Sequence, residues 1–347
     1  MKLRIGILST ASIVPRLIGA VREAENLMSA QTESTSPSAA QPAGGSLEDC
    51  VVSAIASRSL EKARQKAELW GIPKAFGSYE ELIQDPEIDI VYIAVINSEH
   101  YRLTKLALGA RKHVFCEKPF TLEAGQAREL FALARDRGLF LMEMQKTVFL
   151  PVICKVRELI QSGSFGPITM ADFSSSYAPD YNGWFFDAAK GGGPLYGNAE
   201  YSLQLMQYLL GCFASEWTGL RTKSGTGVED QFSLVVRMED DTLYTNKTSM
   251  RSETIHTGYI YGEKGYIEIP DYWKARKALL HYKEKSEPVV LEAPCEYELM
   301  YEVLHGEACI RQGLTESPVM TEEMTVRALE VLADIQKLWN PAPPDSL

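Results

Sequence analysis

Several features that define other classes of protein are missing from this 347-residue sequence. No stretch approaches the roughly 18 uninterrupted apolar residues that would indicate a membrane-spanning helix, and the first residues resemble a strand rather than a signal peptide. The six cysteines form no C-x-x-C pair and no cluster with histidine, so neither a disulfide framework nor a metal site is predicted. We therefore expect a cytoplasmic protein with free thiols.

Basic residues are also in short supply. The chain carries 35 Lys and Arg against 46 Asp and Glu, a formal net charge of −11. This balance argues against nucleic acid or an anionic membrane as a partner, and favours a small-molecule substrate. The length and a hydrophobic content of 45% are enough for about two domains with sizeable cores.

Strand-like and helix-like segments alternate through residues 1–145. Strands are predicted at 3–8, 51–56, 88–95, 114–116 and 139–142, with helices at 11–23, 59–70, 78–84, 101–110 and 122–137. This alternation predicts an α/β fold with a doubly wound parallel sheet of the Rossmann type. The segment 28–46 is rich in Ser, Ala, Pro and Gly, and is predicted to be a flexible insertion that is either tolerated or serves as a lid or binding arm.

Residues 146–347 have a different character. After a helix at 155–160, strand-like runs occur at 168–177, 217–223, 231–238, 242–250, 254–261 and 265–269, and helices are predicted at 298–311 and 322–338. Short turns between the strands predict an antiparallel meander in a large open sheet. We expect this second domain to bind substrate and to form a homodimer or homotetramer through its sheet.

The turn after the first strand reads Gly6-Ile-Leu-Ser-Thr-Ala11, where a dinucleotide fingerprint has G-x-G-x-x-G or G-x-G-x-x-A. Leu8 replaces the second glycine, which normally lets the backbone approach the pyrophosphate. Ser9 and Thr10 supply hydroxyl groups and amides at the start of the following helix. The segment is therefore either a variant nucleotide-binding turn or a plain tight turn.

The second strand ends at Ser57 and Arg58, with Lys62 one turn further along. NAD-binding sheets usually carry Asp or Glu here to bind the ribose hydroxyls. A guanidinium and an ammonium suit a 2′-phosphate instead, so NADP is favoured over NAD. The alternative is that Arg58 is a solvated residue at the start of a helix.

The turn after the third strand contains Val95, Asn97 and His100. Because the carboxyl ends of parallel strands meet at one edge of the sheet, this turn faces the same crevice as the first two. Asn97 is predicted to bind the ribose or the nicotinamide region. An ordinary helix start, capped by Ser98, explains the segment nearly as well.

The segment FCEKPF, residues 115–120, follows the next apolar strand. It places Glu117 and Lys118 at the carboxyl end of that strand, where a fixed cation would face cofactor and substrate. Taken alone, the tripeptide Glu-Lys-Pro also fits a surface lysine before a turn proline. The other turns at the same edge of the sheet favour a functional lysine.

Together, GILSTA, ASRSLEKA, YIAVINSEHY, HVFCEKPF and GGGPLYGNAEY make the sequence similar to the Gfo/Idh/MocA family, named after glucose-fructose oxidoreductase and inositol dehydrogenase. The resemblance covers almost the whole chain. It implies a Rossmann domain, an α/β domain with an open antiparallel sheet, bound NADP or NAD, and redox chemistry on sugars, inositols or related alcohols and ketones. It also implies that Lys118 lies near the nicotinamide and the reacting oxygen, and that the Lys118-Pro119 bond is cis.

The same resemblance assigns an acid/base role to Tyr201, which stands where many members of the family have His. Tyrosine at this place is similar to the dimeric dihydrodiol dehydrogenase branch. Gly197 stands where the family usually has Asp, and Asn198 or Glu200 is a candidate to take over its function. The Trp184 segment also departs from the family, which often has Arg after this Trp.

The sequence thus predicts an NAD(P)-dependent oxidoreductase acting on a sugar, cyclitol or dihydrodiol-like substrate. The alternative is a catalytically inactive cofactor-binding sensor of the same fold. The predicted catalytic residues are Lys118 and Tyr201, and the predicted substrate contacts are Lys118, Trp184, Asn198 and Tyr201. Predicted cofactor contacts are Gly6, Leu8, Ser9, Thr10, Ala11, Ser57, Arg58, Lys62, Val95, Asn97, His100, Glu117 and Lys118.

Overall fold

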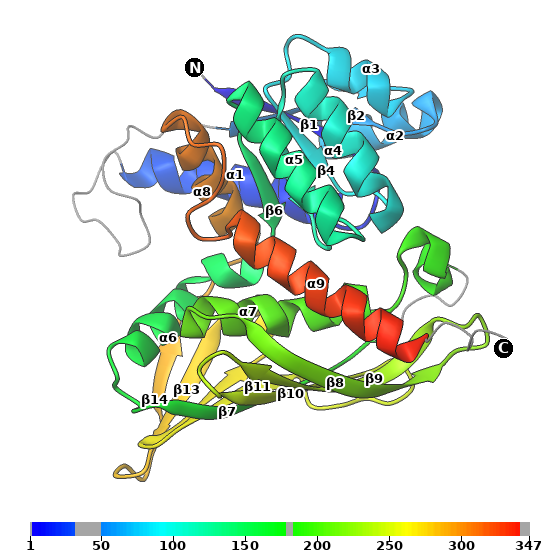
Figure 1. Ribbon diagram of the computed structural model, residues 1–347. Coiled ribbons are helices and arrows are strands. Elements are labelled where there is room, and N and C mark those ends of the chain that lie inside the picture. The colour runs from blue at the N-terminus through cyan, green and yellow to red at the C-terminus, as the bar shows by residue number, and fades with distance from the viewer. Residues whose placement is uncertain (1, 32–49, 178–182, 341–347) are drawn as a thin grey trace, which may run out of the picture. The chain divides into compact units, whose positions relative to one another are not determined.

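The computed structural model describes residues 2–31, 50–177 and 183–340, which form two compact units (Figure 1). Unit 1 contains Met1–Thr121, Gly125–Phe149 and Cys295–Glu322, and unit 2 contains Leu122–Ala124, Leu150–Pro294 and Glu323–Leu347. The chain returns to unit 1 near its end. The sequence-based division into residues 1–145 and 146–347 did not anticipate this return.

Unit 1 is built on a six-stranded parallel sheet in the order β3-β2-β1-β4-β5-β6. The strands are β1 Leu3–Leu8, β2 Cys50–Ala56, β3 Lys74–Phe76, β4 Ile90–Ile93, β5 His113–Glu117 and β6 Leu141–Met144. This order is that of a doubly wound Rossmann sheet and confirms the predicted fold class. The three-residue β3 was not predicted, since it is too short to show a periodic pattern.

The helices of unit 1 are α1 Val14–Gln31, α2 Leu60–Trp70, α3 Tyr79–Gln84, α4 His100–Gly109, α5 Ala124–Arg137 (whose first residue falls in unit 2) and α8 Met300–Arg311. Two of them, α2 and α3, begin at the capping residues that the sequence indicates. Ser59 caps α2 by accepting the amide of Lys62, and Gly71 ends it in the left-handed region at φ 66°. Ser78 caps α3 in the same way.

Helix α1 is longer than predicted and continues to Gln31. It therefore includes residues 28–31, which the sequence analysis assigned to the flexible insertion. Met, Ala and Gln are good helix formers, so the helix does not stop where the large apolar side chains end. Residues 32–46 of the predicted insertion lie outside the described residues.

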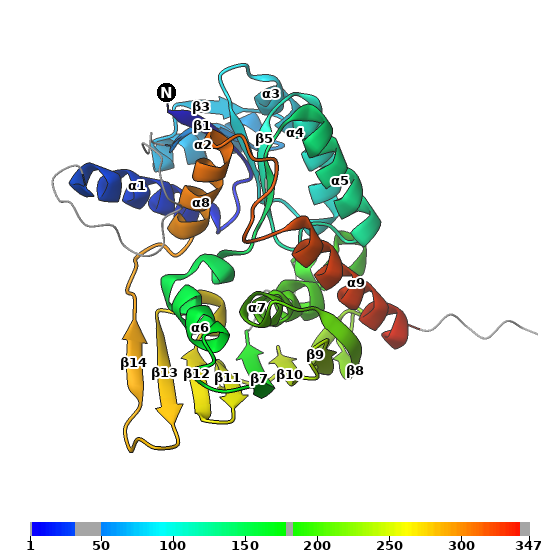
Figure 2. The same ribbon diagram turned by 60° about the vertical axis from the view of Figure 1, so that its left-hand side comes forward.

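Unit 2 contains an eight-stranded sheet in the order β14-β13-β12-β11-β7-β10-β9-β8, which Figure 2 shows nearly edge-on. The strands are β7 Ile168–Ser176, β8 Ala214–Lys223, β9 Glu229–Met238, β10 Leu243–Ser249, β11 Thr257–Gly262, β12 Gly265–Pro270, β13 Lys277–Tyr282 and β14 Val289–Glu292. The sheet is mostly antiparallel, as predicted. It is not a simple meander, because β7 lies between β11 and β10 and pairs with β10 in parallel. Strands β13 and β14 were missed.

One face of this sheet is covered by helices and carries the core of unit 2. Helices α6 Pro151–Gln161 and α7 Glu200–Leu210 lie on that face (Figure 2), and α9 Glu322–Trp339 completes the fold. Along β9, Phe232, Leu234 and Val236 are buried, while the alternating Val235 is 44% exposed. The pattern has the period of two expected for a sheet with one covered face.

Among residues 2–31, 50–177 and 183–340, no helix is both long and apolar enough to cross a membrane.

Candidate active site

The first turn of unit 1 brings Ser9, Thr10 and Ala11 to the start of α1. The amide of Ala11 donates to Ser9 Oγ at 2.9 Å, and regular helix starts only at Val14, three residues later than predicted. Leu8 is fully buried, so its side chain belongs to the core and only its backbone borders the turn. The turn can therefore present backbone amides to a phosphate group despite Leu8.

Gly6 has a structural reason of its own. A Cβ atom built on Gly6 would lie 2.5 Å from Leu82 Cδ2 and 3.1 Å from Ile88 Cγ2. Glycine is thus needed for close packing against β1, whether or not a nucleotide approaches here. The predicted cofactor contact at Gly6 stays a prediction.

The second strand delivers exposed cations at its carboxyl end. Ser57 is buried at the end of β2, while Arg58 and Lys62 are both exposed. Burial raises the pKa of the Tyr79 phenol, and the nearby positive charge of Arg58 offsets part of this rise. The exposure of the two cations is compatible with binding a phosphate group, and the predicted contacts of Arg58 and Lys62 with the cofactor stay predictions.

The segment after β5 has the predicted geometry, and the Lys118-Pro119 peptide bond is cis. Its backbone is held by two side chains from other elements. The carbonyl oxygen of Pro119 lies 2.8 Å from His100 Nδ1, and the amide of Phe120 donates to Glu143 Oε1 at 3.0 Å. Both His100 and Glu143 are buried, so these are bonds that solvent does not weaken.

His100 was predicted to contact the cofactor, and the structure gives its ring a different position. Nδ1 faces the carbonyl of Pro119, and Nε2 faces the carbonyl of Val95 at 3.2 Å. Burial lowers the pKa of His100, so the neutral ring donates to one of the two carbonyls, and the shorter distance favours Pro119. With both nitrogens directed at the backbone, His100 holds the lysine segment in place.

Glu117 receives a hydrogen bond from the hydroxyl of Tyr92, which is fully buried on the neighbouring strand β4. Burial and the charge of Glu117 both raise the pKa of that phenol, so Tyr92 stays a neutral donor. Tyr92 and Glu143 were not recognised from the sequence. Each lies within a strand-like apolar run, where only pairing with a partner distant in sequence would show a polar role.

A buried group of charged side chains lies next to Glu117. Lys146 follows β6, and burial lowers the pKa of its ammonium while the charge of Glu117 raises it. Glu302 on α8 is fully buried, and neither of its carboxylate oxygens has a hydrogen-bond partner within the described part of the chain. Burial and the charge of Glu117 raise the pKa of the Glu302 carboxyl well above its usual value.

In unit 2, the glycine-rich segment leads into a helical stretch that carries Tyr201. A π-helical turn at Leu195–Ala199 precedes α7, and Tyr201 is the second residue of α7 with 9% of its surface exposed. The amide of Leu195 donates to Glu229 Oε1 at 3.0 Å, which fixes the start of this stretch. Gly193 has φ 111° and would clash with Glu229 if it carried a Cβ atom, so glycine is required there.

Asn198 lies one turn before Tyr201 and is buried. Its Oδ1 atom accepts from Ser175 Oγ at 3.0 Å and from Tyr272 Oη at 3.3 Å. That oxygen is thus occupied by Ser175 on β7 and by Tyr272 in the short helical turn after β12, and Asn198 anchors the segment. If Asn198 contacts the substrate as predicted, it does so through its Nδ2 amide group. Trp184, the other predicted contact, is 37% exposed beside Phe185.

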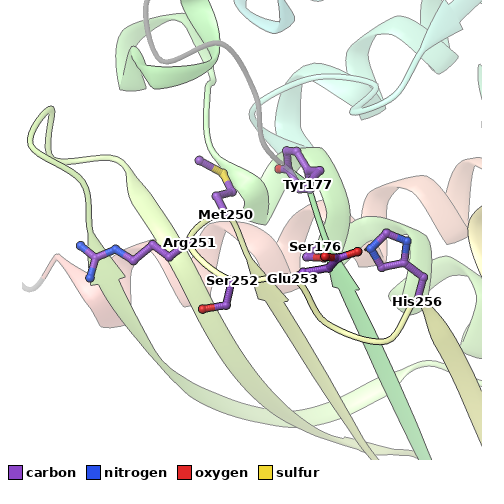
Figure 3. A pocket seen from close by; sticks show the side chains of 7 residues that line it. All are labelled: Ser176, Tyr177, Met250, Arg251, Ser252, Glu253 and His256. Carbon is purple, nitrogen blue, oxygen red and sulfur yellow. The ribbon is translucent and has the colours of Figure 1, made fainter.

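An open pocket of about 330 Å³ lies at the carboxyl ends of the parallel strands β7 and β10 (Figure 3). Its lining comes from the end of β7 and from the loop after β10: Ser176, Tyr177, Met250, Arg251, Ser252, Glu253 and His256. Tyr177 also borders Gly197, since its hydroxyl lies 3.1 Å from the position of a Cβ atom there. None of these pocket residues was predicted from the sequence.

Comparison with known proteins identifies the family. The sequence model described as "Oxidoreductase family, NAD-binding Rossmann fold" matches residues 19–145, and that of the "GFO/IDH/MocA C-terminal domain" matches residues 153–268. Trans-1,2-dihydrobenzene-1,2-diol dehydrogenase of Mus musculus is 31% identical over 296 residues, which cover 82% of this chain and 88% of that protein. The corresponding enzyme of Xenopus tropicalis is 32% identical over 285 residues, or 79% and 85% of the two chains.

Solved structures share the fold. Aldose-aldose oxidoreductase from Caulobacter crescentus superimposes with a TM-score of 0.81 at 22% identity, over 97% of each chain. A 3-ketoreductase from Actinomadura kijaniata in complex with NADP gives the same TM-score and identity, over 97% of this chain and 98% of that one. The chain belongs to the Gfo/Idh/MocA family of oxidoreductases, and its cofactor is NAD or NADP.

Proposed function

We propose that this protein transfers a hydride between NADP and a CH–OH group of a vicinal diol, sugar or cyclitol. The observation that carries the proposal is the way Lys118 is fixed at the end of β5. Its neighbours Glu117, Pro119 and Phe120 are held by Tyr92, His100 and Glu143, respectively. A lysine that only bordered a surface turn would not need three buried partners around it.

The roles of the two predicted catalytic residues follow from their chemistry. The nicotinamide ring supplies or accepts the hydride when the cofactor is bound. In the direction of reduction, the phenol of Tyr201 donates a proton to the substrate oxygen. The ammonium of Lys118 stabilises the negative charge that develops on this oxygen. Lys118 belongs to unit 1 and Tyr201 to unit 2, and their action on the same oxygen is part of the proposal.

Similarity to named relatives supports the substrate class. The relatives from Mus musculus and Xenopus tropicalis are named for a cyclic vicinal diol, and those from Caulobacter crescentus and Actinomadura kijaniata for aldoses and for ketoreduction. Each of these names refers to an alcohol or a carbonyl compound, the two partners of a hydride transfer. We expect NADP as the preferred cofactor because Arg58 and Lys62 are exposed at the end of β2.

We also propose that unit 2 forms a homodimer or homotetramer through the sheet face opposite α6 and α7. Large apolar side chains are exposed on three neighbouring strands there: Met170 at 48%, Val235 at 44% and Leu243 at 38%. Tyr259 and Tyr261 on β11 stack on each other, and both rings contact Tyr266 on β12 at tilted angles. An uncovered face of this kind is typical of a subunit interface. The cytoplasmic location stays a prediction from the sequence.

The function is tested with purified protein, NADPH and NADH. Binding is measured by nicotinamide fluorescence, and turnover against ketoses, aldoses, inosones and diketones, with trans-cyclohexane-1,2-diol and NADP⁺ for the reverse direction. Lys118→Ala should lower kcat by about 100-fold or more with little change in cofactor affinity. Lys105→Ala is the control, since this exposed lysine pairs with Glu129 on the surface of unit 1. Tight cofactor binding without turnover on any substrate would contradict the proposal and favour an inactive sensor.

A further inference from the structure

Tyr177 directly follows β7 and carries a buried hydroxyl group. No hydrogen bond to this oxygen occurs within the described part of the chain. Burial raises the pKa of the phenol well above its usual value, so the group is a neutral O–H donor at any physiological pH. Buried hydroxyls in folded proteins are nearly always hydrogen-bonded, so the absence of a partner calls for an explanation.

The hydroxyl of Tyr177 lies in the space that a side chain at position 197 would otherwise fill. A Cβ atom on Gly197 would lie 3.1 Å from Tyr177 Oη and 2.9 Å from the ring of Phe185. Gly197 precedes Tyr201 by about one helical turn, so both positions lie on nearly the same side of the helical stretch. Tyr177 and Tyr201 are close enough to interact electrostatically.

The Tyr177 ring is held in this position by its surroundings. Phe185 contacts it edge to face at a centroid distance of 5.6 Å, and the Tyr177 amide donates to the carbonyl of Ser249 at 3.2 Å. A ring fixed by packing and by its backbone loses little further freedom when a ligand binds. The residue is thus suited to recognise a ligand group at a defined place.

Glu229 is the buried carboxylate that also interacts with Tyr177. Its Oε1 atom already accepts the amide of Leu195 at 3.0 Å, and its Oε2 atom lies 3.7 Å from Arg221 Nη1. The carboxylate is therefore engaged by other groups, and the Tyr177 hydroxyl is left for a ligand. Tyr177 also lines the 330 Å³ pocket after β7 and β10 (Figure 3), which gives a small molecule a route to its ring.

We propose that the Tyr177 hydroxyl binds a second oxygen of the substrate, on the carbon next to the one that is oxidised or reduced. The inference rests on the proposed role of Tyr201, whose phenol handles the reacting oxygen. Two adjacent phenols suit two adjacent oxygens, as in a vicinal diol or an α-hydroxy ketone. Tyr177 is then a specificity-determining residue that distinguishes such substrates from simple alcohols.

The test compares trans-cyclohexane-1,2-diol with cyclohexanol, which differ by one hydroxyl group. Binding of each to the NADPH complex is measured by calorimetry, because an alcohol with reduced cofactor cannot turn over. Tyr177→Phe removes only the hydroxyl and should weaken diol binding about tenfold while cyclohexanol binding changes less than threefold. Gly197→Ala should also weaken diol binding selectively, because its new methyl group pushes against the Tyr177 hydroxyl and against the Phe185 ring that holds Tyr177 in place.

Tyr244→Phe is the matched control, because Tyr244 on β10 is a buried phenol that does not line the pocket. It should leave both affinities unchanged. The midpoint temperature of thermal unfolding of Tyr177→Phe should be no lower than that of the wild type. Removing this hydroxyl leaves no other group of the described chain without a hydrogen bond. Equal weakening for both ligands, unchanged diol binding in Tyr177→Phe, or no diol binding by the wild type would overturn the inference. If the diol binds selectively but no hydride transfer occurs, the proposed function is wrong and the binding role of Tyr177 stands.

Discussion

The Nδ1 atom of His100 lies 2.8 Å from the carbonyl oxygen of Pro119, the residue after the predicted catalytic lysine. The His100 ring is almost fully buried, and its second nitrogen faces the carbonyl of Val95. The imidazole thus links the turn after β4 to the turn after β5. Two of the segments that border the predicted nicotinamide site are positioned by one side chain.

His100→Ala removes this link and leaves the carbonyl group of Pro119 without its donor. We expect a loss of about 1–3 kcal/mol in the free energy of unfolding, and a fall of about tenfold in kcat because Lys118 is less well positioned. Denaturant unfolding and steady-state kinetics measure the two effects. His100→Gln, which keeps an N–H donor of similar reach, should recover part of both. An alanine variant with wild-type kcat would remove the positioning role.

His305 on α8 should make the stability of the protein depend on pH. Ser317 Oγ accepts the amides of Val319 at 3.0 Å and Met320 at 2.9 Å, so its own proton points to His305 Nε2 at 2.8 Å. Nε2 is therefore an acceptor, and burial lowers the pKa of His305 to about 4. The unfolded chain takes up this proton near pH 6.5.

Because the folded-state pKa of His305 is depressed, its contribution to stability is complete above pH 6.5 and is lost as the pH falls toward 4. We expect the free energy of unfolding to drop by about 2 kcal/mol from this group between pH 6.5 and pH 4.5. His305→Gln, which does not titrate, should show a smaller drop over the same range. Equal pH dependence of the wild type and the variant in urea unfolding would contradict this assignment.

Cofactor preference depends on Arg58. The residue is exposed at the carboxyl end of β2, where a guanidinium can make a bidentate contact with a 2′-phosphate. Arg58→Ala should weaken NADPH binding about tenfold or more and NADH binding less than twofold. Fluorescence titration with both cofactors measures the difference. Arg64→Ala, an exposed arginine further along α2, is the control. Equal losses of affinity for NADPH and NADH would show that Arg58 does not bind the 2′-phosphate.

The open face of the unit 2 sheet should carry the subunit contacts. Val235→Lys together with Leu243→Lys places two charges on adjacent exposed strands and should convert the oligomer into smaller species. Light scattering after gel filtration measures the mass. Leu69→Lys serves as the control, because Leu69 is 68% exposed on α2 of unit 1. A wild-type protein that is monomeric, or a double variant of unchanged mass, would contradict the interface.

The ends of the parallel strands could be predicted because each β-turn-α junction has a local signature in the sequence. The apolar strands, the caps at Ser59 and Ser78 and the turn glycine Gly71 depend on residues within a few positions of one another. For the same reason the Lys118 segment could be placed at the end of a strand. The longer α1 and the short β3 were misjudged because neither shows a clear change of pattern at its boundary.

The residues that the sequence did not reveal act through partners distant in the chain. Glu143 holds Phe120 across 23 residues, and Tyr177 borders Gly197 across 20. The return of α8 to unit 1 and the parallel pairing of β7 with β10 are also long-range contacts. Periodicity and capping carry no information about such pairings, so they emerge only from the folded chain.

The missing side chain at Gly197 shows how the structure adds to what the sequence predicts. From sequence, Asn198 and Glu200 were the candidates to replace the missing side chain. In the structure the side-chain oxygen Oδ1 of Asn198 accepts hydrogen bonds from Ser175 and Tyr272. The Tyr177 hydroxyl lies beside Gly197 instead. Tyr177, the residue directly after β7, thus lies where a side chain at position 197 would otherwise be. Its contribution to substrate binding is our proposal.

The central claim is that Tyr201 exchanges the proton while the nicotinamide exchanges the hydride. Its most direct test is the oxidation of trans-cyclohexane-1,2-diol with NADP⁺ by the wild type and by Tyr201→Phe, together with the affinity of each for NADP⁺. We predict that the variant loses at least about 100-fold in kcat and binds NADP⁺ as tightly as the wild type. A Tyr201→Phe variant that retains the wild-type kcat would contradict the account.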